Sequence, residues 1–281
     1  METINKITTS KQTTMYDHLC KMIIGNEEVL WRIVKTAVDE ANHLNVEEIR
    51  RLIKGVHIGD LIVNPHFHLV DKKGFIKEEG MVYYDILCYI DVPQEDGKNI
   101  RVYLNVEIQN NPYPGYSIIT RGYAYVSRIV SEQWGSEYDD KNYDGMKKVY
   151  SLWIMPKAPK RKDGHMNVYE TNERIICGTT VEEKEIYDKG VILAIYLNKE
   201  HDLNKKYEEH DELLTPLMVL LNNVLDYKGK QRIIKEYGLN TKKIESEVKD
   251  MCDLGESIVL EARNEGKQIE RKEKNIAHVK K

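Results

Sequence analysis

The chain has 281 residues, which suits one large domain or a medium domain with an appendage. Charged residues make up 31% and hydrophobic residues 41%, as in ordinary globular proteins. With 42 Lys and Arg against 46 Asp and Glu, the net charge of −4 excludes a polycation that coats nucleic acid by charge alone. Local basic patches remain allowed. The composition is also biased toward Tyr, with 18 against 2 Phe.

The four cysteines, at positions 20, 88, 177 and 252, form no close pair, so neither a zinc knuckle nor a redox motif is predicted. Scattered single cysteines are typical of a reducing compartment. The first 15 residues lack the apolar stretch of a secretory signal, and no run of about 18 apolar residues predicts a transmembrane helix. We therefore expect a cytoplasmic protein with no membrane partner.

Helical periodicity dominates the first part of the chain. In residues 12–53 apolar side chains recur at helical spacing, with an interruption just before Asn26. Asn26 is the expected N-cap of a second helix, because Glu27 and Glu28 then occupy the first turn, where the helix dipole favours acids. A third short helix is expected from Asn45.

From about residue 60 the apolar period changes to two, which predicts strands. A helix separates these strands into two groups, and the chain is helical again from about residue 210. The expected strands are 61–70, 81–92, 99–109, 147–155, about 174–179 and 190–197, with the helix at 116–134.

The strands 81–92 and 99–109 carry the most informative side chains. Each has one apolar face and one face with acids and amides, Asp85 on the first strand and Glu107 and Gln109 on the second. Acids set in otherwise apolar strands need a partner if they are buried.

The turn between these strands decides which residues face each other. A two-residue turn ending at Gly97 would direct Asp85 toward the apolar face. A three-residue turn, with Gly97 in the left-handed conformation, pairs Gln94 with Lys98 and places Asp85 opposite Glu107. We expect the second arrangement.

Opposed residues on two strands have Cβ atoms about 4.5–5.5 Å apart. Two carboxylates at that separation repel each other unless a cation lies between them or one is protonated. Converging carboxylates suit a hydrated Mg²⁺. The other interpretation, a solvated sheet face that carries two acids, stays open from the residues alone.

At these positions the chain resembles the PD-(D/E)XK nuclease superfamily. Asp85, followed on the next strand by Glu107-Ile108-Gln109, is similar to the motif in its E-x-Q form, that of the PD-(D/E)XK family transposases or recombination-promoting nuclease group. The order and spacing of the segments carry the resemblance, which covers about residues 12–200. The other similar segments are 21–27, 112–125 and 147–154.

The resemblance implies an α/β fold with a three-layer, restriction-endonuclease-like core, αβββαβ, around a mixed central sheet. Residues 1–200 would form the nuclease-like domain, with N-terminal helices at 12–53 and the sheet core at 60–200. Residues 201–281 would be a C-terminal helical extension with a charged tail. The implied function is a Mg²⁺-dependent DNA endonuclease, for which Mn²⁺ can substitute, that hydrolyses phosphodiester bonds in transposition or recombination. DNA is the implied partner, and the resemblance allows a homodimer.

The resemblance also implies roles for single residues. Asp85 and Glu107 would bind the metal together with the backbone carbonyl of Ile108, and Gln109 would complete the catalytic set. Glu27 would be an additional helix acid that binds the metal, although the helix dipole alone also explains an acid there.

Gln109 departs from the usual motif, which ends in Lys. Its amide cannot carry a positive charge, but it can bond a water or a phosphate oxygen. How water would be activated is therefore open. The alternative function is a catalytically weak or inactive nuclease fold that binds nucleic acid or protein.

Two sets of basic and aromatic residues are candidate DNA contacts. The first lies at helical spacing on one face of the 116–134 helix, where Arg121 could hold a phosphate with two bonds if that face looks toward the acids. The second is a compact basic loop. A solvated surface explains either set as well. The residues are Arg121, Tyr125 and Arg128 in the first set, and Lys157, Lys160, Arg161 and Lys162 in the second.

Overall fold

The structure, a computed structural model, describes residues 14–63, 82–94, 97–222 and 225–254. Contacts group these residues into two compact units. The larger unit holds the described residues from 24 to 218, and the smaller unit holds residues 14–23 together with those from 219 onward. The domain boundary expected after residue 200 stays a prediction, and the charged tail lies outside the described residues.

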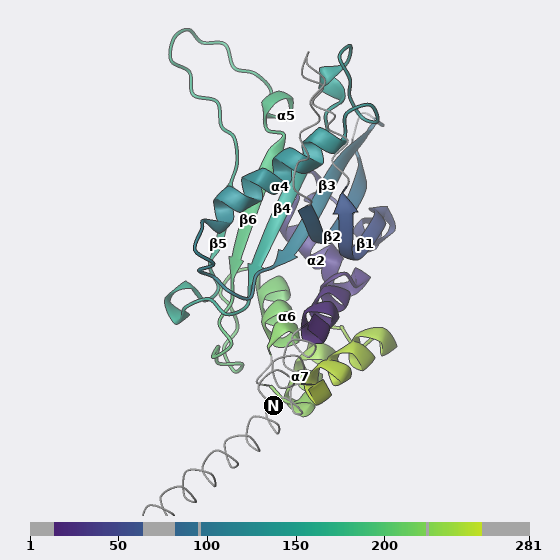
Figure 1. The fold of residues 1–281 in the computed structure, drawn as a ribbon, viewed down its shortest axis with the longest axis vertical. Coiled ribbons are helices and arrows are strands. Elements are labelled where there is room, and N and C mark those ends of the chain that lie inside the picture. The colour runs from purple at the N-terminus through teal and green to yellow at the C-terminus, as the bar shows by residue number, and fades with distance from the viewer. Residues whose placement is uncertain (1–13, 64–81, 95–96, 223–224, 255–281) are drawn as a thin grey trace, which may run out of the picture. The chain divides into compact units, whose positions relative to one another are not determined.

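The larger unit is built on a six-stranded mixed sheet (Figure 1). Its strand order is β1-β2-β3-β4-β6-β5, with antiparallel pairing from β1 to β3, parallel pairing from β3 through β4 to β6, and an antiparallel edge strand β5. The predicted α/β class and mixed sheet are confirmed. In chain order the elements are α2 (Glu27–Ala37), η1 (Asp39–Ala41), α3 (Val46–Leu52), β1 (Ile53–Val63), β2 (Val82–Pro93), β3 (Asn99–Ile108), α4 (Ile118–Glu132), η2 (Tyr143–Gly145), β4 (Lys148–Met155), η3 (Lys160–Lys162), β5 (Met166–Tyr169), α5 (Lys184–Tyr187) and β6 (Gly190–Tyr196).

Helices lie on both faces of this sheet. The helix α4 lies across β4 and β6, where Tyr125 and Val126 join a buried cluster with Trp153 and Ile192 (Figure 1). On the opposite face the hydroxyl of Tyr150 donates a 2.6 Å hydrogen bond to Glu40 in η1, directly after α2. Tyr150 and Trp153 point to opposite faces because side chains alternate along a strand.

The predicted helix starts at the N-terminal end of the larger unit are confirmed. The side chain of Asn26 accepts a hydrogen bond from the backbone of Glu28, which caps α2. Asn45 and Glu48 form a reciprocal capping box at the start of α3. Both caps satisfy backbone N–H groups that have no partner inside the helix.

The strand predicted at 61–70 begins earlier than expected, at Ile53. Gly55 and Gly59 both have positive φ angles, +58° and +95°, and the β1–β2 register shifts twice along this stretch. Such bulges break the two-residue alternation from which a strand is recognised. The remainder of the predicted strand, from residue 64, lies outside the described residues.

The strand predicted at about 174–179 is wrong. These residues form no strand, and Ile176 is 86% exposed. The sheet instead ends in β5, a four-residue edge strand that pairs antiparallel with β6. Two adjacent isoleucines resembled a strand in the sequence, but nothing in the described part of the larger unit covers them.

The smaller unit is helical in its described part. Residues 14–23 and 242–254 are helical, α6 (Asp211–Leu221) ends in this unit, and α7 (Tyr227–Glu236) lies within it. Lys230 is fully buried, and its ammonium donates to the carbonyl of Leu220 at 3.3 Å. Burial lowers the pKa of Lys230. In the described ranges no helix is both long and apolar enough to cross a bilayer.

Candidate functional site

The hairpin between β2 and β3 has the register expected from its turn. The backbone N–H of Gln94 donates to the carbonyl of Lys98 at 2.8 Å, and Gly97 has a φ of +79°. The paired residues run from Pro93 with Asn99 to the last pair, Ile86 with Val106. The three-residue turn is confirmed, and the paired residues end one residue before Asp85 and Glu107.

At the end of this ladder, the side chains of Asp85 and Glu107 each accept a hydrogen bond from the backbone of the other strand. The backbone N–H of Asp85 donates to Glu107 Oε1 at 3.1 Å, and the N–H of Ile108 donates to Asp85 Oδ2 at 2.9 Å. Each carboxylate is therefore held by a backbone amide of the neighbouring strand. Glu107 is only 4% exposed, so it does not lie on a solvated sheet face. A buried carboxylate is stable only when it is well bonded.

Gln109 follows directly after β3 and is hydrogen-bonded to the neighbouring strand. Its backbone N–H donates to the carbonyl of Ile154 at 2.8 Å, which continues the parallel register of β3 and β4. Its side-chain nitrogen donates to the carbonyl of Asn111 at 2.6 Å, and its side-chain oxygen accepts from Arg121 at 3.5 Å. The amide therefore has a fixed orientation beside the two acids.

The helix α4 presents Arg121 and Tyr125 toward the acids, the orientation that the sequence left open. The guanidinium of Arg121 donates to the hydroxyls of Tyr125 at 2.7 Å and Tyr116 at 3.0 Å, and it lies 5.1 Å from the centre of the Trp153 ring. Burial works to lower the pKa of Arg121, but the bond to Tyr125 and the nearby Tyr116 and Glu107 outweigh it, so this pKa is raised.

The charges of both acids act on the pKa of Tyr125. Burial and then the charge of Glu107 raise the pKa of Tyr125, Arg121 opposes them, and Asp85 adds to the rise. Charges act more strongly on a group that is close to them and poorly hydrated. The site therefore combines two carboxylates, one guanidinium and a tyrosine that keeps its proton.

Arg128 lies two turns farther along α4. Its charge acts on Tyr84, whose ring packs edge-on against Tyr125 with centres 5.3 Å apart, and on Glu132. Burial raises the pKa of Glu132 to about 7, and Arg128 partly opposes the rise. The structure thus places Arg128 beside another acid on this helix.

The basic loop lies at the same edge of the sheet as the acids. It follows β4, and the carboxyl ends of the parallel strands β3 and β4 meet at one edge. The ammonium of Lys162 lies 4.5 Å from the centre of the Tyr196 ring, and residues 160–162 form η3. Lys157, Lys160 and Arg161 are exposed.

Glu27 is not brought to the two acids. Among the residues that the structure describes, no group of three His, Cys, Asp or Glu side chains is arranged to hold a metal ion. Glu27 is exposed in the first turn of α2, where the helix dipole favours an acid. The donors that do meet are the carboxylates of Asp85 and Glu107, with the carbonyl of Ile108 next in the chain. These are oxygen donors, which fit Mg²⁺ because it is bound through one or two carboxylates and keeps several waters.

Sequence reasoning missed Trp153 in the site, and it expected Tyr116 there only as one of many tyrosines near the acids. Tyr116 and Trp153 both contact Arg121, but they come from the segment before α4 and from β4. The excess of Tyr was the signal for Tyr116. Trp153 is fully buried, and its place under Arg121 depends on the packing of α4 on the sheet, which spacing along the chain does not reveal.

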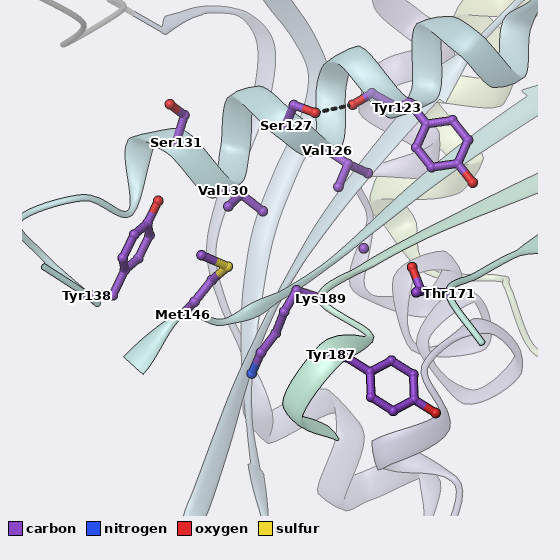
Figure 2. A pocket seen from close by; sticks show the side chains of 11 residues that line it. Tyr123, Val126, Ser127, Val130, Ser131, Tyr138, Met146, Thr171, Tyr187 and Lys189 are labelled. Carbon is purple, nitrogen blue, oxygen red and sulfur yellow. Dashed lines mark hydrogen bonds between the residues drawn. The ribbon is translucent and has the colours of Figure 1, made fainter. Parts of the chain in front are cut away.

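A pocket of about 400 Å³ lies between α4 and the amino end of β6, away from the acids (Figure 2). Tyr123, Ser127, Tyr138 and Lys189 are among its lining residues. Figure 2 shows the Ser127 hydroxyl bonded back to the carbonyl of Tyr123, at 2.8 Å. The acids at the other edge of the sheet take no part in this pocket.

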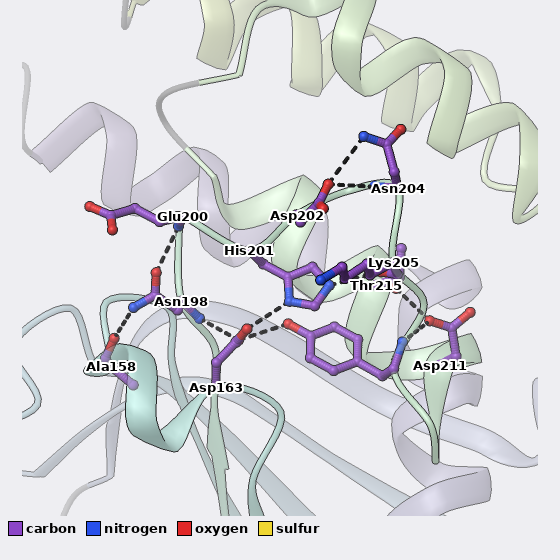
Figure 3. A network of polar contacts seen from close by, with 11 residues as sticks. Ala158, Asp163, Asn198, Glu200, His201, Asp202, Asn204, Lys205, Asp211 and Thr215 are labelled. Atoms are coloured by element: carbon purple, nitrogen blue, oxygen red, sulfur yellow. Dashed lines mark hydrogen bonds and ion pairs between the residues drawn. The ribbon is translucent and has the colours of Figure 1, made fainter.

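A polar network fixes the chain that leaves β6 (Figure 3). It lies at the carboxyl end of the parallel strands β3, β4 and β6, as the acids do. The carboxylate of Asp163 accepts from the hydroxyl of Tyr207 at 2.8 Å and lies 2.6 Å from His201 Nδ1. The other ring nitrogen of His201 lies 2.9 Å from the carbonyl of Lys205. Every group here has a partner within the network. We therefore interpret the network as one that orders this connection, with no role in a reaction.

A scan against protein-family models found no match, and searches of curated proteins and of solved structures found none either. The interpretation of this site therefore rests on its residues and geometry.

Proposed function

We propose that the chain is a Mg²⁺-dependent DNA endonuclease with a core of the PD-(D/E)XK type. The observation that carries the proposal is the meeting of Asp85 and Glu107 at the end of the β2–β3 ladder, with Gln109 next to them. The element order supports it, because a helix, three strands, a helix and a strand follow each other as α3, β1, β2, β3, α4 and β4. This is the αβββαβ order of the resemblance.

Asp85, Glu107 and the carbonyl of Ile108 would hold the ion. When bound, Mg²⁺ or Mn²⁺ would supply an activated water and offset negative charge on the phosphate. The hairpin holds both carboxylates in place before substrate arrives, because backbone amides bond them. Such preorganisation is what electrostatic stabilisation of a transition state requires.

Gln109 and Arg121 would act on the phosphodiester. The amide of Gln109 can orient a water or a phosphate oxygen, although it cannot replace the charge of a Lys. Arg121 can supply that charge, because its planar fork matches two phosphate oxygens. The pKa of Tyr125 is raised, so its hydroxyl stays neutral. This hydroxyl accepts a hydrogen bond from the guanidinium and so holds the fork of Arg121 in position.

The basic loop would bind the DNA backbone next to the reacting phosphate. Its exposed cations lie at the same sheet edge as the acids. Contacts to phosphates position a nucleic acid without reading its sequence. We therefore propose a nuclease with little sequence preference of its own, acting in transposition or recombination.

A second function, binding of nucleic acid without cleavage, is favoured by one observation. Gln109 stands where the usual motif has Lys. The same residues would then bind the metal and DNA, but water would not be activated. Cleavage decides between the two functions.

Nicking of supercoiled plasmid in Mg²⁺ or Mn²⁺ tests the proposal. Wild type should nick the plasmid, and Asp85→Asn and Glu107→Gln should each lower the rate by about 100-fold or more, as when a preorganised group is removed. Asp91→Asn is the matched control, since Asp91 lies on the same strand and bonds Arg101 at 2.7 Å instead. Equal nicking by wild type and both site variants would remove the assignment.

A further inference from the structure

Two tyrosine rings are exposed beside the candidate site. Tyr113 is 61% exposed and Tyr116 is 55% exposed, in the segment that joins β3 to α4. A tyrosine ring has an apolar face and a polar tip, which suits it to a binding surface. Both rings follow within a few residues of Gln109.

The segment that carries these rings is held in one conformation. The backbone N–H of Tyr113 donates to the side chain of Asn111 at 3.0 Å, and the carbonyl of Asn111 accepts from Gln109 at 2.6 Å. Pro112 and Pro114 fix two of its backbone φ angles. The rings are therefore displayed in place, and binding would cost little conformational entropy.

The surroundings of the rings are cationic. The hydroxyl of Tyr116 accepts from Arg121 at 3.0 Å, which ties that ring to the acid site. Burial raises the pKa of Tyr196, and the charge of Tyr113 adds to this rise. The ammonium of Lys162 also lies 4.5 Å from the centre of the Tyr196 ring. Tyr116 is thus linked to Arg121, and the basic loop lies at the same end of the sheet.

We propose that Tyr113 and Tyr116 stack on unpaired bases, so that the strand bound at this site is single-stranded next to the reacting phosphate. This inference rests on the proposed function and names its substrate class. The faces of bases in a duplex are covered by their neighbours, whereas an unpaired base offers its face to an aromatic ring. Rings beside backbone-binding cations are the recurring arrangement for single strands.

Binding without cleavage tests the inference. A labelled 20-nucleotide single strand and the blunt duplex of the same sequence are titrated by fluorescence anisotropy in Ca²⁺. Wild type should bind the single strand more tightly than the duplex. Tyr113→Ala should weaken single-strand binding by about 5- to 150-fold and leave duplex binding unchanged. Tyr113→Phe, which keeps the ring, should bind as wild type does.

Tyr143→Ala is the matched control. Tyr143 is 60% exposed, nearly the same as Tyr113, but it precedes the amino end of β4 at the other edge of the sheet. This variant should bind the single strand as wild type does. Tyr143 also contacts the rings of Trp134 and Tyr138, so circular dichroism checks that both variants keep the fold.

Equal affinity of wild type for both DNA forms, or unchanged single-strand binding in Tyr113→Ala, would overturn the inference. An equal weakening in Tyr113→Ala and Tyr143→Ala would overturn it too. The plasmid assay separates the two proposals. A wild type that nicks plasmid while Tyr113→Ala binds normally removes only the stacking role. Tyr113-dependent binding without any nicking removes only the endonuclease.

Discussion

Asp85 and Glu107 lie just beyond the last pair of the β2–β3 ladder, Ile86 with Val106. Their carboxylates accept the backbone hydrogens that the neighbouring strand presents there, at 3.1 and 2.9 Å. The sequence predicted the register of this hairpin, as far as the pair of Ile86 with Val106, through the turn at Gly97. It did not predict Tyr116 or Trp153 around Arg121, since those contacts depend on how α4 packs.

The carboxyl of Glu132 on α4 makes the stability of the fold depend on pH. Burial raises its pKa from 4.5 to about 7, against the opposing charge of Arg128. The folded chain therefore binds this proton more tightly than the unfolded chain does. Its contribution to stability is complete below about pH 4.5 and is lost as the pH rises through 7.

Glu132→Gln stays neutral at every pH, so it should raise the melting temperature at pH 8 relative to wild type. The difference should shrink toward pH 5, where the wild-type carboxyl is also neutral. Melting curves followed by circular dichroism at both pH values measure this. A difference that does not change with pH would contradict the assigned pKa.

The elements differ in how far the sequence predicted them. β2, β3, β4 and β6 were predicted within a residue or two because their apolar patterns are unbroken. β1 was placed late because two glycines bulge it, and β5 was missed because four residues at an edge are too few for a clear pattern. The helix α4 matters most for the site, since it carries Arg121 and Tyr125 against the sheet.

Close approach of α4 to the sheet depends on Gly122. A Cβ atom there would lie 2.9 Å from Ile192 Cγ2 and 3.0 Å from Trp153 Nε1. Overpacking of this kind costs about 1–3 kcal/mol, and the gain in helix propensity returns at most about 1 kcal/mol. Gly122→Ala should therefore lower the midpoint of urea denaturation.

Ser127→Ala is the control for this change, because Ser127 is exposed on the same helix and only helix propensity and one local bond change. Its midpoint should stay close to that of wild type. A Gly122→Ala variant as stable as wild type would show that α4 can move away from the sheet at little cost, and the position of Arg121 would then be less fixed than described.

At the scale of the larger unit, the functional groups gather at one edge of the sheet. Parallel pairing of β3 and β4 brings Gln109 and the basic loop to that edge, and antiparallel β2 brings Asp85. The net charge of −4 hides this arrangement, because the average over the chain says nothing about where cations lie.

Salt dependence of DNA binding tests the part assigned to the basic loop. Removing one side chain that binds a phosphate should reduce the slope of log K against log salt by about 0.7 for a single strand or 0.9 for a duplex. Lys160→Ala should show this reduction. Lys141→Ala, an exposed lysine ahead of β4 at the other edge, should keep the wild-type slope. Identical slopes for all three proteins would exclude Lys160 from phosphate binding.

The central claim is that Asp85 and Glu107 hold one divalent ion together, and titration with Mn²⁺ by isothermal calorimetry tests it most directly. Wild type should bind one ion, Asp85→Asn and Glu107→Gln should each weaken that binding by about tenfold or more, and Asp91→Asn should bind as wild type does. Binding of equal strength in all four proteins, or no binding by wild type, would contradict the account.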